Sequence, residues 1–166
     1  MPGPDYSFLT PRAEDGPAVL QLAARIENFT PEDVAIVKEL WEESLQPKNE
    51  PDRYHFLIAQ SAAQIMGFVA YGHHPLTRGV YDLYWLAVDP NNRHSGVGRA
   101  LVAQVEKIVL SRGGYLFMIE TSSVDAFSTT RKFYLSCGYQ VAATIPHFYQ
   151  PGDDLVIYTK QLQVPA

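Results

Sequence analysis

Apolar residues in the first third of the chain recur with helical spacing. Two segments begin with a polar residue followed by proline in the first turn, Asp15-Gly16-Pro17 and Thr30-Pro31, a pattern typical of helix starts. After the second start, the apolar residues that share one helical face are Val34, Val37, Leu40, Trp41 and Leu45. The pattern therefore predicts two helices ahead of the sheet, the first ending near Ile26.

From Arg53 onward the spacing changes to short apolar and β-branched runs separated by turn residues, as expected of strands. Runs at 54–59 and 65–71 predict an antiparallel hairpin, and a further strand at 81–88 ends at Asp89-Pro90. The other predicted elements are a strand at 6–9, a helix from 95–98 to Gly113-Gly114, a strand at 115–120, a helix at 127–137, and strands at 139–145 and 155–162. Together they predict an α+β fold, a mixed sheet flanked by helices.

Length and composition favour one globular domain spanning 1–166. The chain has 166 residues, 46% of them hydrophobic and 19% charged, which is enough for one sizeable core. A net charge of -5 disfavours nucleic-acid binding, and no apolar run approaches the length of a membrane span. Cys137 is the lone cysteine, so neither an intrachain disulfide nor a thiolate-rich metal site can form. We expect a soluble cytoplasmic protein that requires no metal.

The loop Arg93-His94-Ser95-Gly96-Val97-Gly98 carries the most informative chemistry, because it joins a strand directly to a helix. The start of a helix offers unpaired amides and a partial positive charge, which suit a pyrophosphate. The two glycines would let the backbone approach the phosphates, and Arg93 and Ser95 could donate hydrogen bonds. An isolated Gly-x-Gly is also compatible with an ordinary turn, whereas a Rossmann site would need a third glycine where Leu101 stands.

Two longer segments, in order along the chain, resemble the motifs of the GNAT acetyltransferase superfamily. The first runs from Leu86-Ala87-Val88 through the loop to Arg99-Ala100-Leu101, and the second is Phe133-Tyr134 followed by Gly138-Tyr139. The resemblance covers roughly 81–142. It implies a GNAT fold, with helices on both faces of the sheet and a splayed parallel strand pair, one strand ending at Val88 and the other at Glu120.

The same resemblance implies that acetyl-CoA is the acyl donor and that an amine attacks its thioester directly. Backbone groups of Leu86, Ala87 and Val88 would contact the acetyl and pantetheine portions, and an amide there would stabilise the developing oxyanion. The residues that would hold the pyrophosphate are Arg93, His94, Ser95, Gly96, Val97, Gly98, Arg99 and Ala100.

Three residues are candidates for the proton-transfer steps. By resemblance, Tyr134 matches the tyrosine placed near the coenzyme sulfur, where it would act as general acid; alternatively, its ring packs in the core. Asp82 and Glu120 are the alternative general bases, and each could instead be a solvent-facing or structural carboxylate. Strict alternation predicts that Asp82, Tyr84, Leu86 and Val88 share one face of their strand, with Leu83, Trp85 and Ala87 on the other.

The acceptor is expected to be the primary amine of a small molecule or a peptide. The region His147-Phe148-Tyr149 falls in a predicted turn and could border this acceptor or form an exposed hairpin tip, and His73-His74 could belong to the pocket or lie exposed. A non-catalytic acyl-CoA sensor on the same fold is the alternative function. The resemblance also allows a homodimer.

Overall fold

One mixed sheet runs through the chain, which a computed structural model describes over residues 5–47 and 53–162. Its seven strands lie in the order β1-β2-β3-β4-β5-β7-β6, and β4 and β5 pair in parallel. The strands are β1 (Ser7–Leu9), β2 (Tyr54–Ser61), β3 (Gln64–His73), β4 (Val80–Val88), β5 (Leu116–Ser122), β6 (Gln140–Gln150) and β7 (Asp153–Gln161). The α-helices are α1 (Gly16–Ala24), α2 (Pro31–Ser44), α3 (Val97–Ser111) and α4 (Ser128–Ser136). None of the helices in the described residues is long and apolar enough to cross a membrane.

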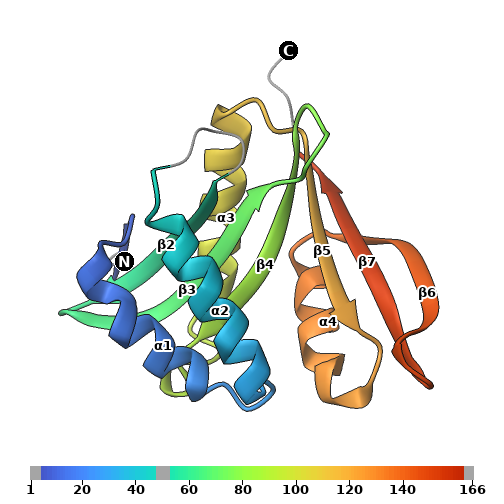
Figure 1. Ribbon diagram of the computed structural model, residues 1–166, viewed down its shortest axis with the longest axis horizontal. Coiled ribbons are helices and arrows are strands. Elements are labelled where there is room, and N and C mark those ends of the chain that lie inside the picture. The colour runs from blue at the N-terminus through green and yellow to red at the C-terminus, as the bar shows by residue number, and fades with distance from the viewer. Residues whose placement is uncertain (1–4, 48–52, 163–166) are drawn as a thin grey trace.

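Helices cover both faces of the sheet, which confirms the predicted layers. Helices α1 and α2 lie on one face of β2, β3 and β4, and α3 lies on the opposite face (Figure 1). The α3 face forms a core that also takes in Tyr134 of α4 and residues of β5 and β7. The core under α1 and α2 contains no residue of β5, β6 or β7. On that side, therefore, α1 and α2 stop at β4, and the face of β5 beyond it is left open.

The predicted helix starts are confirmed, and the cap of α2 shows why the chain turns there. Thr30 and Asp33 form a capping box, in which the amide of Asp33 donates to the Thr30 hydroxyl and the amide of Thr30 donates to the Asp33 carboxylate. Along the predicted apolar stripe, Val37 and Trp41 are buried, whereas Leu45 is 40% exposed. The stripe is therefore core over its middle and reaches the surface at its end.

Strands β4 and β5 stay together for only four residue pairs. They are paired from Val80↔Leu116 to Leu83↔Ile119, after which they separate (Figure 1). At the same point β4 carries a β-bulge, because Ala70 of β3 pairs with Trp85 and Tyr71 pairs with Leu83. The splayed parallel pair predicted from the sequence is therefore present, and a bulge marks where it opens.

The bulge makes the alternation prediction for β4 wrong. Leu83 packs in the same core as Leu86 and Val88, whereas Tyr84 packs in the other core with Trp85 and Ala87. The extra residue at Tyr84 shifts the alternation of side chains by one position. Odd-numbered residues before the bulge therefore face the same side of the sheet as even-numbered residues after it. Asp82 and Tyr84 therefore share a face with each other but not with Leu86.

Strand β6 runs further than predicted, to Gln150. His147, which was predicted to lie in a turn, sits inside the strand with a left-handed φ of 57°, between shifted pairing registers. Its amide donates to Asp154, and its ring nitrogen accepts from the amide of Gly152. These bonds hold an arched segment in β6 that carries the exposed rings of Phe148 and Tyr149.

The packing of α3 on the sheet predicts a large effect of one core substitution. Leu101 is fully buried, so Leu101→Ala should lower the free energy of unfolding by about 2–5 kcal/mol through lost burial and a residual cavity. Leu135→Ala, at a position that is 50% exposed, serves as the matched control and should change it by less than about 1 kcal/mol. Urea denaturation of both variants measures the difference, and equal losses would contradict this packing arrangement.

Candidate functional site

The loop before α3 leaves a row of backbone amides unpaired. The amides of Gly96, Val97, Gly98 and Arg99 donate to no group in the described part of the chain, and no side chain caps the helix. Two residues of the loop, His94 and Gly96, have left-handed backbone conformations, with φ of 63° and 85°. Successive amides that converge in this way form a concave site for an anion.

The two glycines of the loop are required for different reasons. A Cβ on Gly96 would meet nothing within 4 Å, so the positive φ, and not crowding, favours glycine there. A Cβ on Gly98 would lie 3.2 Å from Val88 Cγ2 and 3.5 Å from the ring of Phe133. Gly98 therefore permits the close packing of α3 against β4 and α4, while the space beside Gly96 stays open to a ligand.

Two side chains that were expected to help hold the pyrophosphate are bound elsewhere. The hydroxyl of Ser95 donates to the carbonyl of Asn92 at 2.5 Å. The guanidinium of Arg99 donates to the carbonyl and hydroxyl of Ser136 at 2.8 Å each, which ties α3 to α4. Of their two backbone amides, only that of Arg99 is left for an anion, because the Ser95 amide donates to the carbonyl of Asn92. Arg93 remains half-exposed at the mouth of the loop, 3.8 Å from a carboxylate oxygen of Glu27.

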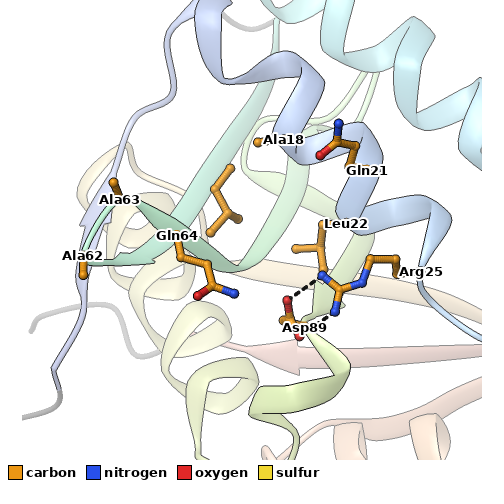
Figure 2. A pocket seen from close by; sticks show the side chains of 9 residues that line it. Ala18, Gln21, Leu22, Arg25, Ala62, Ala63, Gln64 and Asp89 are labelled. Carbon is orange, nitrogen blue, oxygen red and sulfur yellow. Dashed lines mark hydrogen bonds and ion pairs between the residues drawn. The ribbon is translucent and has the colours of Figure 1, made fainter.

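An ion pair between the buried carboxylate of Asp89 and the half-exposed guanidinium of Arg25 anchors the start of this loop. Asp89 is 1% exposed, and Arg25, at the end of α1, reaches both of its oxygens at 3.0 and 3.2 Å (Figure 2). The same carboxylate accepts the amide of Asn91 at 2.8 Å, and the Asp89 amide donates to the carbonyl of Met66. A shallow pocket beside this pair is lined by α1 and the β2–β3 turn. The pair therefore joins α1 to the loop.

The second half of β4 has one edge without a strand partner. Pairing with β5 ends at Leu83, while the opposite edge of β4 stays paired with β3 as far as Val88. Leu86, Ala87 and Val88 thus present backbone groups to the opening between β4 and β5, next to the start of α3. Unpaired strand edges readily take a further hydrogen-bonding chain, and the role expected of these three residues from the sequence stays a prediction.

Tyr134 stands on the α3 side of the opening. Its ring is 5% exposed and packs against the rings of Phe133, Tyr139 and Tyr158. Burial raises the pKa of the Tyr134 phenol, so the group stays protonated at neutral pH. Its hydroxyl bonds to no described residue, and no fully buried side-chain oxygen among the described residues lacks a partner. The oxygen therefore keeps some access to solvent.

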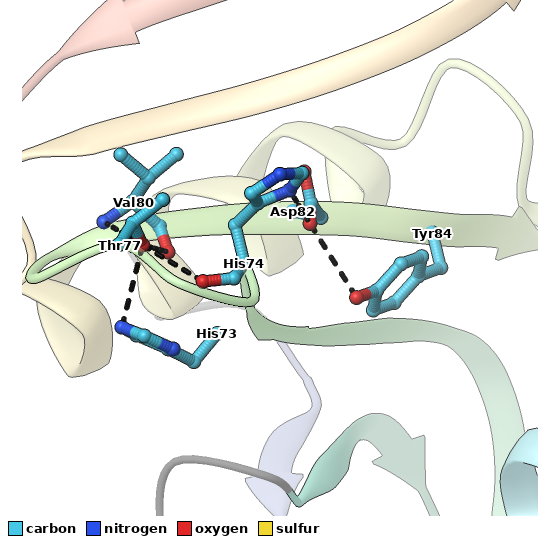
Figure 3. A network of polar contacts seen from close by, with 6 residues as sticks. All are labelled: His73, His74, Thr77, Val80, Asp82 and Tyr84. Atoms are coloured by element: carbon cyan, nitrogen blue, oxygen red, sulfur yellow. Dashed lines mark hydrogen bonds and ion pairs between the residues drawn. The ribbon is translucent and has the colours of Figure 1, made fainter.

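Asp82 lies on the opposite face, in a small polar network (Figure 3). It is 9% exposed, and its Oδ2 lies 2.7 Å from Nδ1 of His74 and accepts the hydroxyl of Tyr84 at 3.4 Å. Burial raises the pKa of Asp82, and the bonds to His74 and Tyr84 oppose that increase. Both contacts fall on Oδ2, which leaves Oδ1 of Asp82 without a donor among the described residues.

Glu120 is exposed at the opening, two residues beyond Met118, which pairs with Asp82 across the strands. By the strand alternation of β5, Glu120 therefore faces the same side of the sheet as Asp82 and Tyr84. Its charge contributes to the raised pKa values of Tyr84 and of Tyr149 on β6. Arg131 donates to the carbonyls of Ser122 and Val124.

The structure thus brings Asp82 and Glu120 to one face of the opening and Tyr134 to the other. Sequence reasoning missed the bond between His74 and Asp82, and it missed the Arg25–Asp89 pair. Residues 74 and 82 come together because the β3–β4 turn folds back on itself, a geometry that no sequence spacing reveals. For Asp89, a polar residue directly after a buried strand was a usable signal.

Comparisons with known proteins identify relatives along most of the described chain. A family model described as acetyltransferase (GNAT) domain matches residues 52–141. An acetyltransferase of Sodalis glossinidius is 32% identical over 100 residues, which make up 53% of this chain and 68% of that protein. An acetyltransferase of Pectobacterium atrosepticum is 33% identical over 100 residues, covering 53% and 69%.

Solved structures agree with this result. A Desulfovibrio desulfuricans protein assigned to the GNAT family of acetyltransferases superposes with a TM-score of 0.91 and 36% identity, over 95% of this chain and 99% of that one. The ribosomal-protein-S18-alanine N-acetyltransferase of Escherichia coli superposes with a TM-score of 0.75 and 17% identity, covering 97% and 96%. The latter likeness concerns the fold alone.

The Arg25–Asp89 pair predicts a measurable loss of stability. Arg25→Ala should lower the free energy of unfolding by about 1–3 kcal/mol, because it leaves a buried carboxylate with one amide partner. Arg12→Ala removes a pair with Glu14 in which both side chains are exposed, and it should change stability by less than about 1 kcal/mol. Chemical denaturation near neutral pH compares the two. Equal effects would show that the Arg25–Asp89 pair is not an anchor.

Proposed function

The chain belongs to the GNAT family of acetyltransferases, and we propose that it transfers the acetyl group of acetyl-CoA to a primary amine of a small molecule or a peptide. The amine attacks the thioester carbonyl directly, without a covalent enzyme intermediate. The observation that carries the proposal is the uncapped row of amides at the start of α3, placed beside the open edge of β4.

The donor would lie across these two backbone surfaces. The amides of Gly96, Val97, Gly98 and Arg99 would hold the pyrophosphate, and Arg93 would add charge at the mouth of the loop. The pantetheine arm would extend along the free edge of β4 and place the thioester near the bulge at Tyr84. An amide of the segment Leu86–Val88 would then stabilise the oxyanion that forms on the carbonyl.

Two protons must leave the amine nitrogen during the reaction, because an ammonium carries three and the amide product keeps one. One proton goes to the sulfur of the departing coenzyme A, and the other reaches solvent. Glu120 is better placed than Asp82 to accept the proton that passes on to solvent, since Glu120 is exposed at the opening and binds no described donor. Asp82 is buried and already accepts hydrogen bonds from His74 and Tyr84.

Tyr134 would supply the proton to the leaving thiolate. Its phenol is neutral, it lies on the α3 side of the opening, and its oxygen is not bound to another residue of the described chain. A general acid in this position assists C–S bond cleavage, and it regains its proton from the amine nitrogen through water.

The amide row predicts that a methyl group at position 96 weakens donor binding. Gly96→Ala strains a backbone with φ of 85°, and it should raise the dissociation constant for acetyl-CoA about tenfold or more by displacing the loop. Gly152→Ala, in the β6–β7 turn with φ of 88° and equally open space, carries the same strain away from the loop. Isothermal titration calorimetry of both variants makes the comparison, and equal affinities would remove the pyrophosphate assignment.

The acid and base assignments are tested by turnover. With spermidine, tyramine, glycinamide and a short peptide with a free N-terminus as probe amines, Glu120→Gln and Tyr134→Phe should each lower kcat for thiol release about 10²-fold or more. The controls Glu42→Gln and Tyr115→Phe alter exposed side chains on α2 and at the start of β5 and should leave kcat unchanged. Unchanged kcat in Glu120→Gln would exclude it as the base, and no thiol release with any amine would favour a non-catalytic sensor.

A further inference from the structure

We propose that His74 and Asp82 orient the hydroxyl of Tyr84 so that its oxygen accepts a hydrogen bond from the acceptor amine, which makes Tyr84 a substrate-positioning residue. This proposal rests on the acetyl-transfer function proposed above. No step of the transfer itself passes through Tyr84. Its part is to fix where the nitrogen stands before Glu120 takes its proton.

The direction in which Tyr84 donates its hydroxyl proton follows from its contact with Oδ2 of Asp82, which His74 also contacts. Oδ2 of Asp82 lies 2.7 Å from Nδ1 of His74 and 3.4 Å from the Tyr84 hydroxyl. An ionised carboxylate only accepts, so Tyr84 must donate its single proton to Asp82. The hydroxyl proton then points toward Asp82, and the lone pairs of the Tyr84 oxygen can accept a hydrogen bond from an N–H group.

The turn between β3 and β4 fixes His74 in this network. The amide of His74 donates to the carbonyl of Val80 at 2.8 Å, and the hydroxyl of Thr77 donates to the carbonyl of His74 at 2.8 Å (Figure 3). Leu76, at the tip of the turn, has a left-handed φ of 63°. These bonds hold the backbone of His74 in place, and the contact of its Nδ1 with Asp82 orients the ring.

The ring of Tyr84 is equally constrained. Tyr54 packs edge-on against it with ring centroids 5.4 Å apart, and a Cβ on Gly72 would come within 3.2 Å of the Tyr84 ring. Because Tyr84 is the bulged residue of β4, no residue of β3 pairs with it. Bulges are common beside binding sites, and at this one the adjacent residues Tyr84 and Trp85 pack on the same face of the sheet, the face that Glu120 shares.

The charges around Tyr84 suit a cationic amine. Burial, Asp82, Tyr54 and Glu120 all raise the pKa of Tyr84, so it remains a neutral phenol. The other groups that act on Asp82 are His74 and His73, which lower its pKa, while burial raises it. An ammonium between Glu120 and the Tyr84 oxygen would meet two acceptors. If Asp82 became protonated, it could donate to Tyr84, whose own proton would then turn toward the amine.

Tyr84→Phe tests the acceptor role directly. It keeps the ring against Tyr54 and removes the oxygen, so the KM for the fastest of the four probe amines should rise about tenfold. The KM for acetyl-CoA should stay unchanged, since the donor site lies on backbone groups of other residues. Tyr115→Phe, which changes the residue just before β5, is the matched control. An unchanged amine KM in Tyr84→Phe would overturn the proposal for Tyr84. The proposed acetyl-transfer function would still stand in that case, provided that the wild type releases thiol.

A pH profile distinguishes orientation from a merely structural role of His74. In His74→Ala, Asp82 loses the partner that most lowers its pKa, so it protonates at higher pH, and the low-pH limb of kcat/KM for the amine should move to higher pH. His74→Asn restores an N–H near the position of Nδ1 and should return the limb part of the way. If the low-pH limb of kcat/KM in His74→Ala stayed at the wild-type pH, the proposed role of His74 in orienting the network would be overturned. Absence of thiol release with every amine would overturn both proposals together.

Discussion

The early separation of β4 from β5 is the constraint on which the site depends. Four residue pairs hold the two strands in parallel, and past Leu83 and Ile119 they no longer pair with each other, while β4 stays paired with β3 and β5 with β7. The separation creates a free backbone edge on β4, opens a space between the two halves of the sheet, and places Glu120 and Tyr134 on opposite faces of that space. If β4 and β5 stayed paired to their ends, the backbone edge of β4 would be occupied and could not bind a ligand.

Some polar groups at the opening are hydrogen-bonded to neighbouring protein groups, and others have no protein partner among the described residues. Asp89, Arg99 and Ser95 are bound to neighbouring protein groups and hold the loop in shape. The amides at the start of α3 and the carboxylate of Glu120 have no partner in the described chain. Groups that no protein group meets are free to bind water or a ligand, so these amides and this carboxylate are available to substrates.

Local capping and apolar spacing predicted the order of elements and the helix starts, whereas the splayed pair was implied by the resemblance to the GNAT superfamily. The sequence did not predict the bulge at Tyr84, since one extra residue in a strand leaves the composition unchanged and only the register with β3 reveals it. The arch at His147 was missed for the same reason. Among the site residues, the loop glycines were identified by type, but the engagement of Ser95 and Arg99 and the contact of His74 with Asp82 depend on tertiary packing.

Backbone amide spectra recorded by NMR with and without coenzyme A test the central claim most directly, because they report on each amide of the loop separately. Saturating coenzyme A should shift the amide protons of Gly96, Val97, Gly98 and Arg99 downfield, as expected when an amide donates to a phosphate oxygen. The amides at the capped start of α2 should not move. Shifts confined to another region, or none at millimolar coenzyme A, would contradict the account.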